Sequence, residues 1–128
     1  MKRILLVDDE KDFVKSVKEF LGMRGYEVIA AYDGTSALKK VQELPDLVLL
    51  DIKMPVMDGY EVLHRIQADC GTAEIPVIML TSKSDTRAIF DAQKLSATDY
   101  IIKPTNLQEL LDMIKKYLDE NKRRPVKI

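Results

Sequence analysis

Hydrophobic residues in this chain form short, nearly continuous runs that alternate with longer segments of helical periodicity. The five runs are RILLV (3–7), EVIA (27–30), DLVLL (46–50), PVIML (76–80) and DYII (99–102). Unbroken apolar runs of this length are typical of parallel strands covered on both faces, because a strand with one wet face alternates apolar and polar residues. The pattern therefore predicts five buried parallel strands.

The segments between these runs carry apolar residues three and four positions apart, as in an amphipathic helix. This spacing predicts helices over 11–24, 34–43, 59–68 and 85–95. Gly25 is suited to end the first helix, because glycine readily adopts the left-handed conformation that follows a helix. Asp58 is suited to cap the third. A last helix is predicted to begin at Asn106, a favourable N-cap residue.

Five strand–helix alternations predict an α/β fold with a doubly wound five-stranded parallel sheet. Right-handed crossovers then place helices on both faces of the sheet. We expect the flavodoxin-like strand order 2-1-3-4-5, in which strands 1 and 3 are neighbours at the switch point. Residues 121–128, NKRRPVKI, lack periodicity and contain a proline. We interpret them as a basic tail or truncated linker that follows a domain of residues 1–120.

Composition and charge narrow the function classes only a little. The chain has 128 residues, 46% hydrophobic and 32% charged, with a formal net charge of -1, so there is no basic field to indicate direct nucleic-acid binding. The first apolar run ends at Val7, which is too short for a signal peptide, and no run is long enough to cross a membrane. One cysteine, Cys70, cannot form an internal disulfide. We expect a cytoplasmic protein without membrane partners.

Polar side chains follow four of the five predicted strands. Asp8 and Asp9 follow the first strand, Asp51 the third, Thr81 the fourth and Lys103 the fifth. In a doubly wound sheet, ligands bind at the carboxyl ends of the strands beside the switch point. These five side chains are therefore expected to line one crevice.

The chemistry of this set favours phosphoryl transfer. Three converging carboxylates suit a hard cation with oxygen ligands, and Mg²⁺ fits better than Zn²⁺ because no His or Cys follows these strands. A lysine and a hydroxyl add the positive charge and the donor that phosphoryl oxygens require. An aspartate can attack phosphorus and form an acyl phosphate. Asp51, at the end of a central strand, is the best candidate nucleophile.

Four stretches in this order resemble the receiver domain of two-component response regulators. They are ILLVDDE (4–10), DLVLLDIKMPVMDGYE (46–61), PVIMLTSKSD (76–85) and TDYIIKPTN (98–106). The resemblance covers about residues 1–120. It implies a phosphorylation-dependent signalling switch and not a turnover enzyme, although the domain would catalyse its own phosphorylation and slow dephosphorylation.

The resemblance also implies a role for each site residue. Asp51 would accept the phosphoryl group from the phosphohistidine of a sensor histidine kinase or of a phosphotransfer protein in a phosphorelay. Asp8, Asp9 and Asp51 would bind Mg²⁺ as its cofactor. The backbone carbonyl of Lys53 would complete the protein's share of the coordination.

The resemblance implies that three further residues bind the phosphoryl group or respond to it. Thr81 resembles the hydroxyl that bonds a phosphoryl oxygen, and Lys103 the lysine that pairs with the phosphoryl group. The Lys103–Pro104 peptide bond would be cis. Tyr100 resembles the aromatic residue that turns inward when Thr81 moves. The face formed by segment 85–95, the fifth strand and the last helix would then change and bind a downstream target or an output domain.

The sequence disfavours several other functions. A phosphatase of the haloacid-dehalogenase type needs a second acid two residues after its nucleophile, where this chain has Lys53. Nucleotide enzymes are disfavoured because neither GxxxxGK[ST] nor GxGxxG follows the first strand. A flavodoxin-like FMN-binding protein is disfavoured because the carboxylates in the crevice would repel the phosphate of FMN. The remaining alternative is a docking module that binds constitutively and is never phosphorylated.

Overall fold

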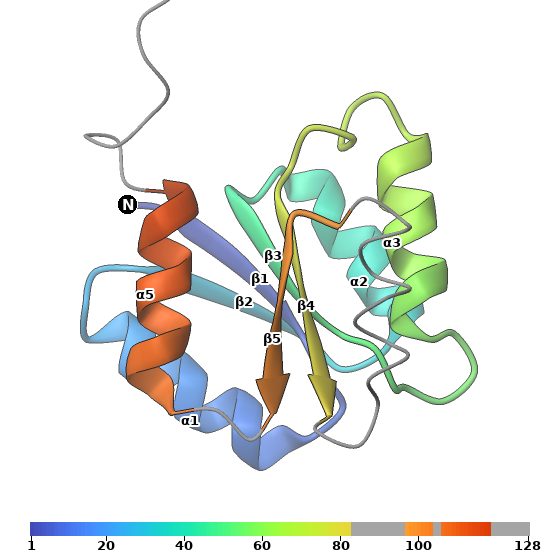
Figure 1. Cartoon of the computed structure of the whole chain (residues 1–128). Coiled ribbons are helices and arrows are strands. Elements are labelled where there is room, and N and C mark those ends of the chain that lie inside the picture. The colour runs from blue at the N-terminus through green and yellow to red at the C-terminus, as the bar shows by residue number, and fades with distance from the viewer. Residues whose placement is uncertain (83–96, 104–105, 119–128) are drawn as a thin grey trace, which may run out of the picture.

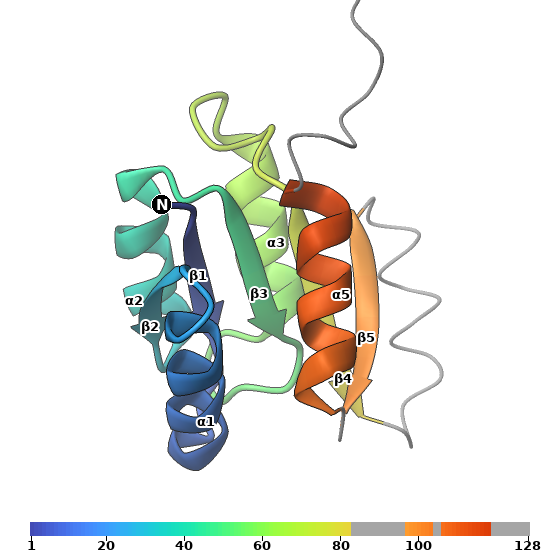
Figure 2. The same ribbon diagram turned by 90° about the vertical axis from the view of Figure 1, so that its left-hand side faces the viewer.

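The computed structural model describes residues 1–82, 97–103 and 106–118 of the chain. Within these residues the five predicted strands form one parallel sheet in the order β2-β1-β3-β4-β5, as predicted. The strands are β1 (Arg3–Val7), β2 (Glu27–Ala31), β3 (Leu47–Asp51), β4 (Val77–Ser82) and β5 (Asp99–Lys103). The arrowheads of β3 and β5 point the same way in Figure 2, so the carboxyl ends of the strands share one edge of the sheet.

The helices also follow the prediction. They are α1 (Lys11–Gly22), α2 (Gly34–Lys40), α3 (Gly59–Ala68) and α5 (Leu107–Leu118), and a short 3₁₀ turn, η1 (Val41–Glu43), extends α2. Asp58 Oδ1 caps α3 by accepting a hydrogen bond from the Glu61 amide at 3.0 Å. Asn106 Oδ1 accepts from the Glu109 amide at 2.7 Å at the start of α5. The predicted helix at 85–95 lies outside the described residues.

Gly25 ends the first helix as expected, although the helical residues stop at Gly22 instead of residue 24. Gly25 has a φ of 91°, and the Tyr26 amide donates to the Leu21 carbonyl at 3.1 Å. This bond joins the residue after the left-handed position to the last full turn, which is the Schellman arrangement.

Two hydrophobic cores lie on opposite faces of the sheet. On one face α1 and α5 pack against β1, β3 and β4, and on the other face α2 and α3 do so. Figure 1 shows this layering, with α1 and α5 on one side of the strands and α2 and α3 on the other. All five residues of β3 are buried, since it is the middle strand and both faces are covered.

Three strands extend further than the sequence predicted. Asp51, Thr81 and Lys103 were predicted to follow their strands, whereas they belong to the strands themselves. The ladder continues because Asp51 pairs in register with Leu80, and Thr81 with Ile102. These polar side chains are therefore held by sheet hydrogen bonding and not by a loop, which fixes their positions more firmly.

The loop from β3 to α3 folds back closely on the end of β3. A Cβ atom on Gly59 would lie 2.3 Å from the Asp51 carbonyl oxygen, and the Gly59 amide donates to the Ile52 carbonyl at 2.8 Å. The absence of a side chain at Gly59 therefore allows α3 to begin directly beside Asp51. Val56, in the same loop, is fully exposed and has a φ of 70°, a conformation that β-branched residues rarely adopt.

We expect Val56→Gly to raise the free energy of unfolding by about 1 kcal/mol. Glycine adopts the left-handed conformation without the Cβ clash, and this gain exceeds the entropy that it adds to the unfolded chain. Urea denaturation measures the change. Val56→Ala, which keeps the Cβ atom, should give a smaller gain. A loss of stability in Val56→Gly would contradict a strained backbone.

Candidate functional site

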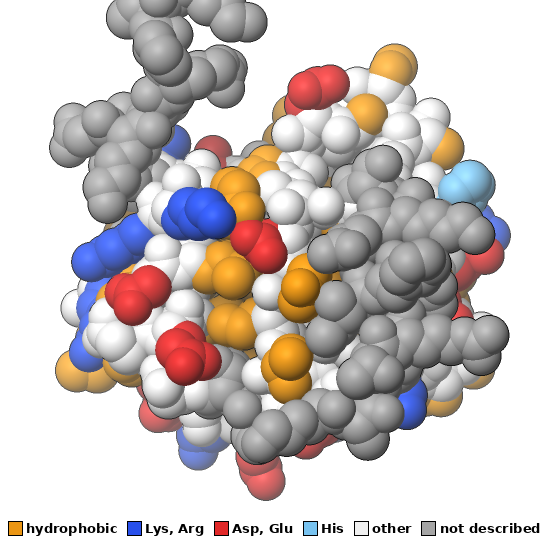
Figure 3. Space-filling model, in the orientation of Figure 1, with side chains coloured by type: hydrophobic (Ala, Val, Ile, Leu, Met, Phe, Trp, Pro, Cys, Tyr) orange, Lys and Arg blue, Asp and Glu red, His pale blue; other side chains and the backbone are white. Residues whose placement is uncertain are grey.

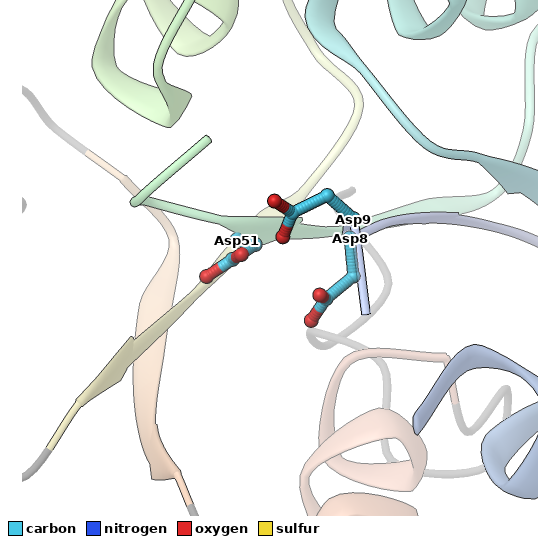
Figure 4. Close-up of side chains that lie close together, drawn as sticks. All are labelled: Asp8, Asp9 and Asp51. Atoms are coloured by element: carbon cyan, nitrogen blue, oxygen red, sulfur yellow. The ribbon is translucent and has the colours of Figure 1, made fainter. Parts of the chain in front are cut away.

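Three carboxylates meet at the carboxyl ends of β1 and β3. One oxygen atom from each of Asp8, Asp9 and Asp51 lies within 4.8 Å of the other two. Figure 4 shows the three side chains gathered beside the ends of these strands. Asp8 is fully buried and Asp51 is 7% exposed, while Asp9 is exposed. The predicted convergence of the three acids is confirmed by this geometry.

Asp8 sits where the chain turns from β1 into α1. Its amide donates to the Ala31 carbonyl at 3.0 Å, which holds it against β2. Its Oδ1 atom accepts from the Glu10 amide at 2.9 Å, and its Oδ2 atom accepts from Lys103 Nζ at 2.8 Å. Asp8 therefore does not cap α1; it closes a local turn and binds the lysine.

Lys103 reaches the acids from the opposite side of the crevice, at the end of β5. Its ammonium group pairs with Asp8 and with Glu10 Oε1 at 2.7 Å, and it lies 4.6 Å from the centre of the Phe13 ring. Burial alone would lower the pKa of Lys103, but the hydrogen bonds to Asp8 and Glu10 outweigh it, so that the pKa lies above its ordinary value. The side chain is therefore a fixed positive charge.

Asp51 is the acid whose charge is least compensated. Burial first, and then the charge of Asp8, raise the pKa of Asp51 from 3.8 to about 7, with smaller contributions from Asp9 and Glu10. Lys103 opposes this increase but does not cancel it. Among the described side chains none forms an ion pair or hydrogen bond with the Asp51 carboxylate. A cation placed between the acids would favour the ionised carboxylate.

Thr81 brings a hydroxyl group with no partner into the same region. It is 2% exposed, and its Oγ1 atom finds no hydrogen-bond partner among the residues that the structure describes. A buried hydroxyl without a partner costs about 1–3 kcal/mol, so it is uncommon in a folded protein. The hydroxyl is thus available to a ligand in the crevice.

One cavity of about 430 Å³ brings together Asp9, Asp51, Thr81 and Lys103, while the fully buried Asp8 does not line it. Ten residues line it: Asp9, Glu10, Phe13, Asp51, Ile52, Lys53, Leu80, Thr81, Ser82 and Lys103. Glu10 and Phe13 were not predicted as site residues. An acid at the start of a helix usually indicates a favourable dipole interaction, and the third acid of VDDE was the available signal. Phe13 lies within the predicted helix 11–24, where an apolar residue fits the buried face of an amphipathic helix.

Tyr100 does not line this cavity. It is partly buried and packs against the core that includes Met79. Because Tyr100 pairs in register with Met79, and Thr81 with Ile102, the side chains of Tyr100 and Thr81 lie on the same face of the sheet. Pro104 lies outside the described residues, so the cis peptide stays a prediction.

The donor set fits a divalent cation of the magnesium class. Three carboxylates supply hard oxygen ligands, and neither a histidine nor a cysteine lines the cavity. Burial first and the charge of Asp8 second raise the pKa of Asp51, so the ionised carboxylate is disfavoured unless a cation is nearby. The site can therefore accept a cation and, next to Lys103 and Thr81, an anionic group.

Comparison with known proteins decides the family. The family model for the response regulator receiver domain matches residues 4–115. The chain belongs to this family. Receiver domains are the signalling input of two-component response regulators, which agrees with the function implied by the four motifs and disfavours a constitutive docking module.

Individual relatives place the same domain in different settings. The DNA-binding response regulator MtrA of Mycobacterium tuberculosis is 38% identical over 128 residues, which is 99% of this chain and 55% of MtrA. The chain spans about half the length of the curated relatives it matches. Vibrio cholerae chemotaxis protein CheY4 superposes with a TM-score of 0.86 at 32% identity, covering 92% of this chain and 99% of that one.

A third relative is part of a kinase. The receiver domain of a signal transduction histidine kinase from Syntrophus aciditrophicus has a TM-score of 0.85 at 31% identity, covering 100% of this chain and 98% of that one. The receiver fold of this chain is thus shared with all three. Within the described residues, no helix is both long and apolar enough to span a membrane.

The unpartnered hydroxyl of Thr81 gives a test of the site. We expect Thr81→Val to raise the free energy of unfolding of the metal-free protein by about 1 kcal/mol, because it removes a buried polar group without changing volume. Thr72→Val is the matched control, since Thr72 is equally buried and donates to the Ile66 carbonyl at 2.7 Å. It should lose about 1 kcal/mol.

Denaturant unfolding of both variants in EDTA measures the two changes. If both variants lose the same free energy of unfolding, the hydroxyl of Thr81 already has a hydrogen-bond partner and is not available to a ligand.

Proposed function

We propose that this receiver domain accepts a phosphoryl group on Asp51 from the phosphohistidine of a histidine kinase or a phosphotransfer protein. The observation that carries the proposal is that one cavity contains both Asp51, whose charge Lys103 only partly offsets, and Thr81, a buried hydroxyl without a partner among the described residues. A carboxylate oxygen of Asp51 attacks phosphorus, the phosphorus–nitrogen bond breaks, and the imidazole leaves.

Asp8, Asp9 and Asp51 would hold the metal, with the backbone carbonyl of Lys53 as a further ligand. Mg²⁺ fits because it prefers oxygen ligands and retains water molecules that phosphoryl oxygens can replace. When bound, it would supply positive charge for the oxygens of the transferring group. Asp8 would contribute from the buried side of the metal site, and the exposed Asp9 is the more accessible ligand.

Lys103 and Thr81 would bind the phosphoryl group after transfer. The ammonium group of Lys103 offsets the charge of its oxygens, and the hydroxyl of Thr81 donates the hydrogen bond that it lacks within the described residues. As Thr81 moves toward the phosphoryl group, Tyr100, on the same face of the sheet, would turn into the space it leaves. To shift the ratio of active to inactive conformation from 1:99 to 99:1, the phosphoryl group must favour the active state by about 5.5 kcal/mol.

The output would be read on the side of the molecule where α5 meets β5. Figure 3 shows hydrophobic side chains along this face. Ile102, which follows the buried Ile101 in β5, is 38% exposed. Tyr117 of α5 donates to Asp99 of β5, and burial together with this hydrogen bond raises the pKa of Tyr117 to about 12. This face would bind a downstream target or an output domain.

Slow self-dephosphorylation would end the signal. A water molecule attacking the same phosphorus needs space near Asp51, and Ser82, a small residue, lines the cavity there. This reaction makes the domain its own phosphatase without making it a turnover enzyme.

Incubation with acetyl phosphate and Mg²⁺ tests the proposal. We expect the intact mass to increase by one phosphoryl group, and Asp51→Asn to abolish the increase because an amide is a poor nucleophile. The change should also require Mg²⁺ and disappear in EDTA. Asp33→Asn, at the cap of α2 and outside the cavity, is the matched control and should react normally.

Rapid quenching keeps a short-lived adduct measurable. An unchanged mass at every quench time, or modification that persists in Asp51→Asn, would contradict Asp51 as the acceptor.

A further inference from the structure

Glu10 makes a contact that the proposed chemistry does not use. Its Oε1 atom lies 2.7 Å from Lys103 Nζ, closer than the 2.8 Å between Lys103 and Asp8. The two residues are separated by 93 positions in the sequence. Glu10 therefore connects the start of α1 directly to the end of β5.

The backbone around Glu10 directs its side chain to this contact. Glu10 occupies the N-cap position of α1, with an extended backbone (φ −85°, ψ 98°), yet its side chain makes no capping hydrogen bond. Its amide is held by Asp8 Oδ1, and its carbonyl accepts from the Val14 amide at 3.1 Å. The main chain is thus fixed on both sides, while the carboxylate is committed to the lysine and not to the helix.

The position of Lys103 has a consequence for phosphorylation. In this state the ammonium group pairs with Asp8 and Glu10, and no ion pair joins it to Asp51 among the described residues. A phosphoryl group on Asp51 must therefore compete with Glu10 for the lysine. The charge of Glu10 also opposes the added anion, so competition and repulsion act in the same direction.

We propose that Glu10 is a positioning residue that holds Lys103 toward α1 in the unphosphorylated state, and that its ion pair with Lys103 opposes the phosphorylated state. This inference rests on the proposed function of Asp51 and Lys103. Because Glu10 is 64% exposed, solvent weakens the pair, and its effect is a modest adjustment of the equilibrium.

Beryllofluoride, which mimics a phosphoryl group on a carboxylate, tests the proposal without a kinase. The dissociation constant of beryllofluoride is measured at saturating Mg²⁺ for the parent protein, Glu10→Gln, Glu10→Asp and Asp12→Asn. We expect Glu10→Gln to bind about threefold more tightly, a change in the range of an exposed ion pair. Asp12→Asn removes one exposed acid from the same helix turn and should leave the dissociation constant unchanged.

Glu10→Asp separates the ion pair from charge alone. Aspartate keeps the negative charge but is one methylene shorter, so it no longer reaches Lys103. The proposal predicts that Glu10→Asp binds more tightly than the parent, as Glu10→Gln does. If Glu10→Asp matches the parent while Glu10→Gln binds more tightly, repulsion acts through space and the proposal is overturned. It is also overturned if both match the parent.

A metal-free measurement checks the resting contact itself. In EDTA, lysine-selective ¹⁵N NMR should show slow hydrogen exchange at Lys103 Nζ in the parent and at least severalfold faster exchange in Glu10→Asp and Glu10→Gln. Unchanged exchange in both variants would contradict the positioning role. Failure of the parent to bind beryllofluoride would instead remove the proposed function, which is a different outcome from equal binding by parent and variants.

Discussion

Electrostatic repulsion among Asp8, Asp9 and Asp51 is the constraint on which the rest of this structure depends. Three carboxylates with oxygen atoms within 4.8 Å of one another destabilise the fold unless a proton or a cation reduces their charge. Lys103 compensates Asp8, while burial first and the charge of Asp8 second raise the pKa of Asp51 to about 7. The folded protein therefore keeps a site that is unfavourable when empty, and binding of a cation relieves it.

The sheet makes this arrangement possible. Asp51 and Lys103 are the last residues of β3 and β5, and Thr81 lies one residue before the end of β4. Their backbones are tied to neighbouring strands, so the side chains cannot move apart without breaking sheet hydrogen bonds. Close packing of Gly59 against the end of β3 further fixes Asp51. The energy that brings like charges together comes from burial of the two cores.

Much of this site could be predicted from the sequence, because parallel strands order their polar ends predictably. The run LVLLD placed Asp51 at the crevice, and VDD placed Asp8 and Asp9 there. The pattern could not show that the ladder continues through Asp51 and Thr81, since a polar residue ends an apolar run whether or not the strand ends. The 3₁₀ turn after α2 was also missed, because its apolar spacing resembles that of a helix.

Individual side-chain contacts could not be predicted from the sequence, for a different reason. The Glu10–Lys103 pair and the unpartnered Thr81 hydroxyl depend on which atoms meet across 93 residues or fail to meet, and no local pattern records this. Glu10 was therefore not among the predicted site residues. These contacts distinguish a set of polar residues at strand ends from a site in which each side chain has a defined position.

The free energy of unfolding of the parent and Asp51→Asn, measured in EDTA between pH 4 and pH 8, tests the central claim most directly. The pKa of this carboxyl group is about 7 when folded and 3.8 when unfolded, so between these pH values only the unfolded state releases the proton. The free energy of unfolding therefore falls as the pH rises from 3.8 to 7, and the loss is complete above pH 7. Asp51→Asn should therefore gain stability relative to the parent as the pH rises from 4 to 7, by up to about 4 kcal/mol at pH 8, since one pKa unit corresponds to about 1.4 kcal/mol. Mg²⁺ should raise the melting temperature of the parent and narrow this difference. Equal stability of the two proteins at pH 8, with no response of the parent to Mg²⁺, would contradict the account.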